Sequence, residues 1–102
     1  ASGAIYGIRL LEALKGSPIE THLIISRTAQ ITIACETDYS PEQVQNLAHT
    51  VHSAQDLAAS ISSGSFKTMG MVIAPCSMRC MGEIASSVTS TLLTRAADVV
   101  LK

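Results

Sequence analysis

Short β-branched segments alternate with segments of helical periodicity along the sequence, and this alternation constrains the fold more than any other feature. Residues 4–15 repeat apolar side chains at helical spacing, whereas residues 19–26 are rich in β-branched residues and become apolar toward their end. Residues 69–74 form a second short apolar run. The order helix, strand, helix, helix, strand, helix predicts an α/β fold with helical layers around a parallel sheet.

Several residue types indicate where the helices begin and end. Ser2 stands at the expected N-cap of the first helix, and Gly16 stands where that helix should stop. Ser40-Pro41-Glu42-Gln43 has the pattern of a capping box and predicts a helix through about His49. The remaining expectations are a helix over 27–35, a loop over 60–68 and a helical stretch after Pro75 with a break at 86–90.

The expected elements do not complete a sheet. In a doubly wound fold, a small-residue turn such as residues 1–4 normally follows a strand, and no strand precedes it here. Two strands are also few for the apolar faces of at least four helices. We therefore expect residues 1–102 to be part of a larger domain that is truncated at both ends.

Composition and charge exclude several classes of protein. The chain is 47% hydrophobic and 15% charged, so it has enough apolar side chains for one packed domain. The formal net charge is -1 and there is no run of Lys or Arg, so the basic surface of a nucleic-acid or anionic-membrane binder is not expected. No apolar run approaches the roughly 20 residues that span a bilayer, and no signal peptide is evident. We expect a cytoplasmic protein.

The cysteines and histidines do not form a metal-binding pattern. Cys76 and Cys80 are four residues apart, but no second pair of ligands accompanies them, and His49 and His52 also lack completing ligands. With Cys35 the number of cysteines is odd, which favours free thiols over a disulfide framework. No metal is therefore expected.

Three serine-containing turns are candidates for binding a phosphate-bearing cofactor. Ser2, Ser26 and Ser77 each lie at the end of an expected strand or the start of an expected helix. In doubly wound proteins, such turns aim helix N-termini at ligand phosphates. Each serine could equally be a simple helix cap, and the spacing alone leaves both interpretations open.

Six motifs, in order, resemble those of UbiX-like flavin prenyltransferases. They are Ala-Ser-Gly-Ala at 1–4, Glu-Thr-His-Leu at 20–23, Glu-Thr-Asp-Tyr at 36–39, Ile-Ser-Ser-Gly-Ser-Phe at 61–66, Ala-Pro-Cys-Ser-Met at 74–78 and Arg-Ala-Ala-Asp-Val-Val-Leu-Lys at 95–102. The resemblance covers the whole chain but only about the first half of the family's length. It implies a Rossmann-like (flavodoxin-like) three-layer αβα sandwich that binds FMN and assembles into a homo-oligomer such as a dodecamer.

The resemblance also implies roles for individual residues. The FMN-binding residues would be Ala1, Ser2, Ser26, Ser77, Met78, Arg79 and Cys80. The catalytic residues would be Glu36 and Ser2, and the substrate phosphate would be bound by Ser63, Ser65, Arg95 and Lys102. Arg79 and Cys80 replace a Lys and a Thr of the family pattern, which leaves a cation but removes a hydroxyl. Without the resemblance, Arg95 and Lys102 would be interpreted as solvated helix charges and Glu36 as a helix-end carboxylate.

The implied activity is transfer of a dimethylallyl group from dimethylallyl phosphate to reduced FMN. The product is the prenylated cofactor used by UbiD-like decarboxylases, in ubiquinone synthesis or in phenolic-acid breakdown. Two alternatives remain open at this stage. The chain could belong to an FMN-binding subunit of an aromatic acid decarboxylase, or to a flavin-binding module without catalytic activity.

Overall fold

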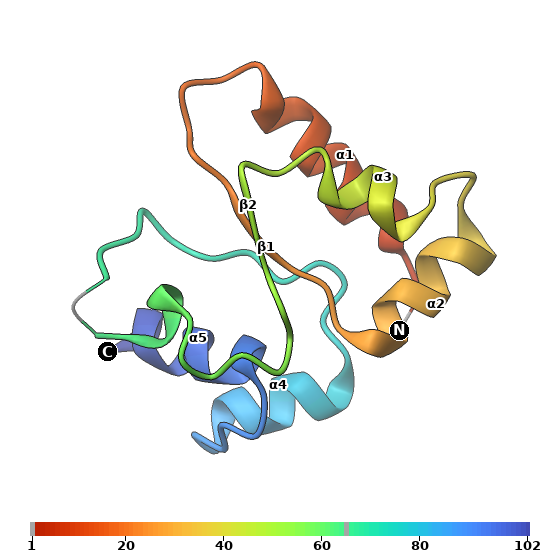
Figure 1. Ribbon diagram of the computed structural model, residues 1–102. Helices are drawn as coiled ribbons and strands as arrows, with labels where there is room; N and C mark the ends of the chain where they lie inside the picture. Colours follow the sequence, from red (N-terminus) through yellow and green to blue (C-terminus); the bar gives the residue numbers. More distant parts are fainter. Residues whose placement is uncertain (1, 65) are drawn as a thin grey trace.

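The centre of the structure is a two-stranded parallel sheet (Figure 1). The computed structural model describes residues 2–64 and 66–102. Strand β1 (His22–Ile24) pairs with β2 (Thr50–His52), so that Leu23 lies opposite Val51 and Ile24 opposite His52. The strands are parallel because helices connect the end of β1 to the start of β2.

The other regular elements are helices. Their bounds are α1 (Ala4–Lys15), α2 (Arg27–Glu36), α3 (Pro41–Gln45), the short 3-10 helix η1 (Ser60–Ser62), α4 (Met78–Ala85) and α5 (Leu92–Leu101). The expected helices are thus present, and the break expected at residues 86–90 separates α4 from α5.

The two faces of the sheet bury different sets of side chains, as alternation along a strand requires. Leu23 and Ile25 pack with residues of α1, α2 and α3, including Ile8 and Ile33. Ile24 packs on the opposite face against η1 and α5, where Leu92 is fully buried. Figure 1 shows α1, α2 and α3 on one side of the strands and α4 and α5 on the other. This is the predicted three-layer αβα arrangement.

The observed helix ends confirm some of the expected caps and correct others. The Ser40 hydroxyl accepts the Gln43 amide, and the Gln43 side chain accepts the Ser40 amide, so the capping box is present. The helix that it starts ends at Gln45, earlier than expected. Ser2 does not cap α1. Gly3 takes that position with φ of 96°, which glycine adopts without the strain of a Cβ, and no side chain caps the helix.

The second expected strand is wrong, and a different strand replaces it. Residues 69–74 pair with no strand in the described chain, and Met69 and Val72 are 90% and 68% exposed. Apolar side chains alone do not make a strand, since the backbone also needs a neighbour to complete its hydrogen bonds. Thr50–His52 provides that neighbour for β1 instead, in a segment that the sequence analysis left unassigned.

Gly7 tests the packing of the 69–74 segment against α1. A Cβ at Gly7 would lie 2.6 Å from the carbonyl oxygen of Ala74, a backbone atom that cannot rotate away. We expect Gly7→Ala to lower the free energy of unfolding by about 1–3 kcal/mol, as overpacked sites do. Urea unfolding of the full-length protein that carries these residues would measure the change.

Gly82→Ala is the matched control, because it also adds a methyl group to a helix. Nothing lies within 4 Å of a Cβ at Gly82, so alanine should stabilise the protein by about 0.5–1 kcal/mol through its higher helix propensity. Equal effects of the two substitutions would contradict close packing of Ala74 against α1.

Candidate functional site

Two of the three predicted serines cap helices that start at the candidate site. Ser26 follows β1 and its hydroxyl oxygen accepts the Ala29 amide at 3.1 Å, and Ser77 accepts the Cys80 amide at 3.1 Å. Capping therefore accounts for the oxygen of each hydroxyl. The hydroxyl proton of each serine can still be donated, and the first amides of α2 and α4 have no partner within the helix. Both turns combine a helix cap with donors suited to an anionic or carbonyl oxygen.

The N-terminal turn is tied to the end of α2. The Gly3 amide donates to Oε1 of Glu36 at 3.0 Å, and α1 packs against α2. This bond brings the exposed Ser2 and the carboxylate of Glu36 to one place, although 33 residues separate Gly3 from Glu36. The two predicted catalytic residues therefore belong to neighbouring segments. Ala1, predicted with them, lies outside the described residues.

A second group of predicted residues surrounds η1. The Arg95 guanidinium donates through Nε to the carbonyl of Ser62 at 3.4 Å, so α5 holds a cation beside the loop that contains Ser63. Ser65, predicted for the same phosphate, lies outside the described residues. Lys102 at the end of α5 pairs with Asp98 at 3.0 Å and is 73% exposed. Arg95 thus lies next to the predicted phosphate-binding loop, whereas the Lys102 ammonium is paired with Asp98, one turn earlier in α5.

Arg79 lies at the start of α4 and is paired rather than free. Its Nε donates to Glu83 at 3.2 Å, and Glu83 also accepts the Ser90 hydroxyl at 2.8 Å. The Ser90 hydrogen bond, helped by Arg79, lowers the pKa of Glu83 despite partial burial. The guanidinium itself is 85% exposed, so the pair holds Arg79 near the turn without enclosing it. Met78, next to it, is 78% exposed.

Cys80 is a neutral thiol in this site. Burial raises the pKa of Cys80 to about 11, with a further contribution from the neighbouring Cys76. A thiol with such a pKa is protonated near neutral pH and is a poor nucleophile. Its position at the start of α4 therefore points to packing or weak hydrogen bonding.

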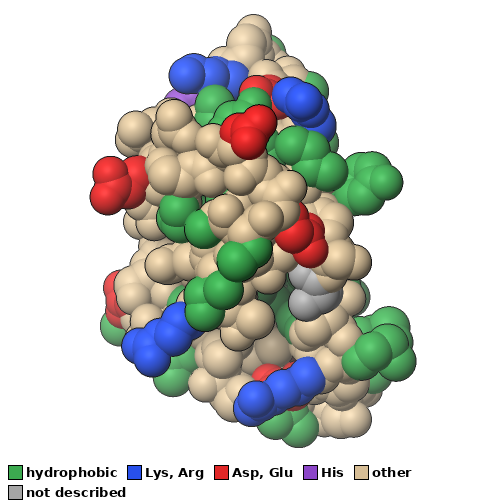
Figure 2. Space-filling view, turned by 90° about the vertical axis from the view of Figure 1, so that its right-hand side faces the viewer, with side chains coloured by type: hydrophobic (Ala, Val, Ile, Leu, Met, Phe, Trp, Pro, Cys, Tyr) green, Lys and Arg blue, Asp and Glu red, His purple; other side chains and the backbone are tan. Residues whose placement is uncertain are grey.

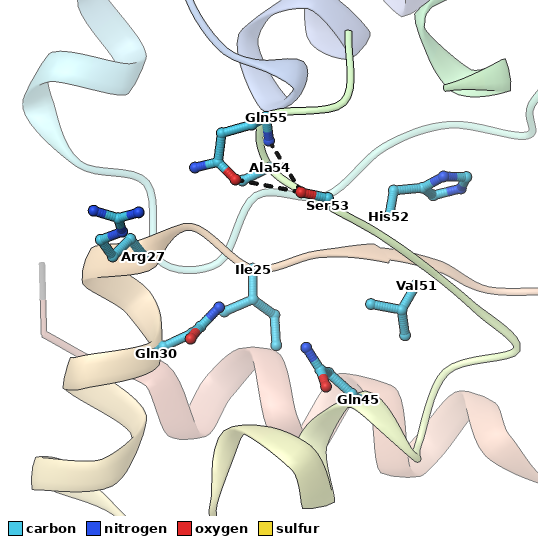
Figure 3. Close-up of a pocket in the computed structure, with 9 residues that line it drawn as sticks. All are labelled: Ile25, Arg27, Gln30, Gln45, Val51, His52, Ser53, Ala54 and Gln55. Carbon is cyan, nitrogen blue, oxygen red and sulfur yellow. Dashed lines mark hydrogen bonds between the residues drawn. The ribbon is translucent and has the colours of Figure 1, made fainter. Parts of the chain in front are cut away.

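A cavity lies at the carboxyl ends of the two strands (Figure 3). Its volume is about 440 Å³, and Ile25, Val51 and Ala54 contribute its apolar wall. The polar lining residues are Arg27, Gln30, Gln45, His52, Ser53 and Gln55. None of these was predicted as a site residue, because residues 50–52 were not expected to form a strand that ends there.

Charges are dispersed on one face of the molecule. On the face shown in Figure 2, Lys and Arg side chains lie among Asp, Glu and apolar side chains and do not gather into one patch. Within residues 2–64 and 66–102, no three His, Cys, Asp or Glu side chains are placed to hold a metal ion. No helix in this part of the chain is both long and apolar enough to cross a membrane.

Comparison with known proteins gives a consistent result. The family model described as Flavoprotein matches residues 1–102. Flavin prenyltransferase UbiX of Escherichia coli is 59% identical over all of this chain, which covers 54% of that relative. A probable UbiX-like flavin prenyltransferase of Bacillus subtilis is 52% identical, with 50% of its length covered. The chain thus spans about half the length of the curated relatives it matches.

Solved structures match the fold equally well. AnUbiX in complex with FMN and dimethylallyl pyrophosphate superposes with a TM-score of 0.97 at 48% identity, over 99% of this chain and 54% of the other. A dodecameric FMN-dependent UbiX-like decarboxylase from Escherichia coli O157:H7 also gives a TM-score of 0.97, at 49% identity, over 99% of this chain and 55% of that one.

The three cysteines should differ in reactivity. We expect iodoacetamide at pH 8 to modify the exposed Cys35 and Cys76 before Cys80, since only about one Cys80 thiol in a thousand is ionised there. Peptide mass spectrometry over time would measure the three rates. Cys76→Ser removes one cause of the raised pKa and should speed modification of Cys80. Modification of Cys80 as fast as Cys35 in the unsubstituted protein would contradict the assignment.

Proposed function

The chain belongs to the flavoprotein family, and we propose that it forms the FMN-binding part of a flavin prenyltransferase. The observation that carries this proposal is the match at a TM-score of 0.97 to AnUbiX, which was solved with FMN and dimethylallyl pyrophosphate. The 59% identity to the Escherichia coli flavin prenyltransferase supports it. In this proposal, the enzyme transfers a dimethylallyl group to reduced FMN, which supplies the nucleophilic ring atoms when it is bound.

The serine turns have the donors that FMN requires. In this proposal Ser26 and Ser77 donate their hydroxyl protons to the cofactor, while the unpaired amides at the starts of α2 and α4 face its oxygens. Arg79 and Cys80, with Met78, form the rest of the α4 turn, and Ala1 and Ser2 form the N-terminal turn. Arg79 is 85% exposed and can turn toward a ligand, while Glu83, 14% exposed, keeps its hydrogen bond from the Ser90 hydroxyl.

Glu36 and Ser2 are the proposed proton-transfer groups. The Gly3 amide holds one oxygen of Glu36, which fixes the carboxylate beside the N-terminal turn and leaves its other oxygen available. A positioned carboxylate can accept or return a proton as the prenyl group is joined. Ser2 is exposed in the same turn and does not cap α1, so its hydroxyl is not used by the helix.

The phosphate of the prenyl substrate requires cations and hydroxyls near its leaving oxygen. We assign this role to Ser63, Ser65, Arg95 and Lys102. Arg95 is oriented toward the Ser63 loop by its bond to the Ser62 carbonyl, and Lys102 would have to release Asp98. The proposed donor is dimethylallyl phosphate, and the relative's dimethylallyl pyrophosphate offers the same prenyl group with one more phosphate.

The full-length protein is the form to test. Reduced FMN with dimethylallyl phosphate, or in a second reaction with the diphosphate, should yield prenylated FMN detectable by mass spectrometry. Absence of product with both donors would contradict the proposal, and FMN binding without product would favour a non-catalytic flavin module. Release of carbon dioxide from a phenolic acid by this protein alone would favour a decarboxylase, as one structural relative is described.

Further properties belong to the same proposal. The enzyme would work in the cytoplasm and form a homo-oligomer, as the dodecameric relative does. Its product would serve a UbiD-like decarboxylase. Adding such a decarboxylase to the reaction, and measuring decarboxylation only when both proteins are present, would test this functional link.

Glu36→Gln tests the proposed proton transfer. Glutamine keeps an oxygen for the Gly3 amide but cannot accept a proton, so we expect product formation to slow by about a hundredfold or more. FMN binding, followed by flavin fluorescence, should be retained. Glu42→Gln, an exposed carboxylate in the first turn of α3, is the matched control and should leave the rate unchanged. Equal rates in the two variants would remove Glu36 from the mechanism.

A further inference from the structure

Two histidines that the proposed function does not use are joined across the sheet. His22 begins β1 and His52 ends β2, and their side chains lie on the face that packs against η1 and α5. The rings are stacked, with centroids 5.2 Å apart and planes 12° apart. Nδ1 of His22 lies 2.9 Å from Nε2 of His52, and Nε2 of His22 lies 3.1 Å from Oε1 of Glu20. The three side chains form a continuous hydrogen-bonded chain.

The hydrogen-bond acceptors among Glu20, His22 and His52 determine which nitrogens carry protons. An ionised Glu20 can only accept, so Nε2 of His22 carries a proton. With His22 neutral, its Nδ1 is an acceptor, and Nε2 of His52 must donate to it. One added proton can be accommodated on Nδ1 of His22 if the proton of His52 moves to its other nitrogen. The 2.9 Å bond survives in either state.

A second added proton cannot be accommodated. Both facing nitrogens would then be donors, and two cations would lie at hydrogen-bond distance. Burial and the neighbouring His22 lower the pKa of His52, while Asp56 opposes this shift. Glu20 and Asp56 are thus the carboxylates that act on the pair, one on each ring. The hydrogen-bonded arrangement of the two rings therefore disfavours protonation of both imidazoles, even with these two carboxylates nearby.

The pair lies at both ends of the loop that carries Ser63. His52 is the last residue of β2, where the loop starts, and the Phe66 ring meets the edge of His22 at 5.4 Å, where the loop ends. Between them, η1 is secured by Ala59 and Ile61 in the core and by Arg95. Loss of the imidazole contact would therefore loosen the Phe66 end of the loop first, because the start of the loop is also held by β2 and by the Leu92 amide, which donates to the Ala54 carbonyl.

We propose that His22 and His52 are positioning residues that hold the Phe66 end of the Ser63 loop closed, and that they release it when both are protonated. The part of this proposal that concerns substrate phosphate rests on the function proposed above for Ser63. The closed loop binds fewer protons than the open loop below the ordinary imidazole pKa near 6.5. The loop is therefore most stable above that pH and is lost as the pH falls through the lowered pKa of His52.

Hydrogen exchange of the full-length protein tests the loop without using enzymatic activity. The Phe66 amide donates to the Ser63 carbonyl at the end of the loop that the imidazole contact holds. After correction for the intrinsic exchange rate, its protection should fall by up to about tenfold for each pH unit in the window where only the open loop binds the proton. Amides of α2 should keep their protection over the same range.

His52→Gln should remove this dependence, because its amide can still donate to Nδ1 of His22 but does not titrate. His49→Gln, which removes the remaining histidine of the chain, should retain the dependence. Equal pH dependence in unsubstituted protein and His52→Gln, or its loss in His49→Gln, would overturn the proposal. If His52→Gln does not fold, an NMR titration of the unsubstituted protein decides. Two separated imidazole steps are expected, and independent titration of the two rings at ordinary pKa values would overturn it.

The consequence for substrate has a separate measurement. If Ser63 binds the prenyl phosphate, KM for dimethylallyl phosphate should rise below pH 6.5 in the unsubstituted enzyme and change less in His52→Gln, with kcat less affected. A pH-dependent loop with no change in KM would leave the histidine pair intact as a positioning device and overturn its link to substrate. Absence of prenyl transfer altogether would instead contradict the proposed function and leave the exchange result unaffected.

Discussion

Pairing of β1 with β2 is the interaction on which the rest of the structure depends. The strands are three residues long, so the sheet is held by burial of its faces more than by its hydrogen bonds. Leu23 and Ile25 pack against the layer formed by α1, α2 and α3, and Ile24 packs against η1 and α5. A shift of the register by one residue would exchange these two sets of contacts. The turns after both strands are placed by the same register.

Helix capping connects the fold to the site. The hydroxyl oxygens of Ser26 and Ser77 each accept a hydrogen bond from the amide at the third position of the helix that follows. These bonds fix the direction in which α2 and α4 begin. The first amides remain unpaired for the same geometric reason. Capping and cofactor binding are thus compatible uses of one serine. The two interpretations that the sequence left open for Ser26 and Ser77 do not compete.

The sequence predicted features that depend on local chemistry. The capping box at Ser40 and Gln43 and the end of α1 at Gly16 involve residues close in the chain, and they are found as expected. It failed where the outcome depends on a distant partner. Residues 69–74 are apolar but have no strand beside them in the described chain, whereas Thr50–His52 forms a strand because β1 is next to it. The bond between Gly3 and Glu36 and the His22–His52 pair likewise join residues about 30 positions apart.

The charged groups around the candidate site share a further property. Arg79, Arg95 and Lys102 are each bound by a neighbour on the protein, either a carboxylate or a backbone carbonyl. Arg79 and Lys102 are 85% and 73% exposed and can turn toward a ligand phosphate, but Glu83 and Asp98 are only 14% and 12% exposed and each loses a partner when this happens. Arg95 differs, because its carbonyl partner belongs to the loop itself. In the proposed release of the loop, a movement that reaches Ser62 would change the direction of the guanidinium as well as the place of Ser63.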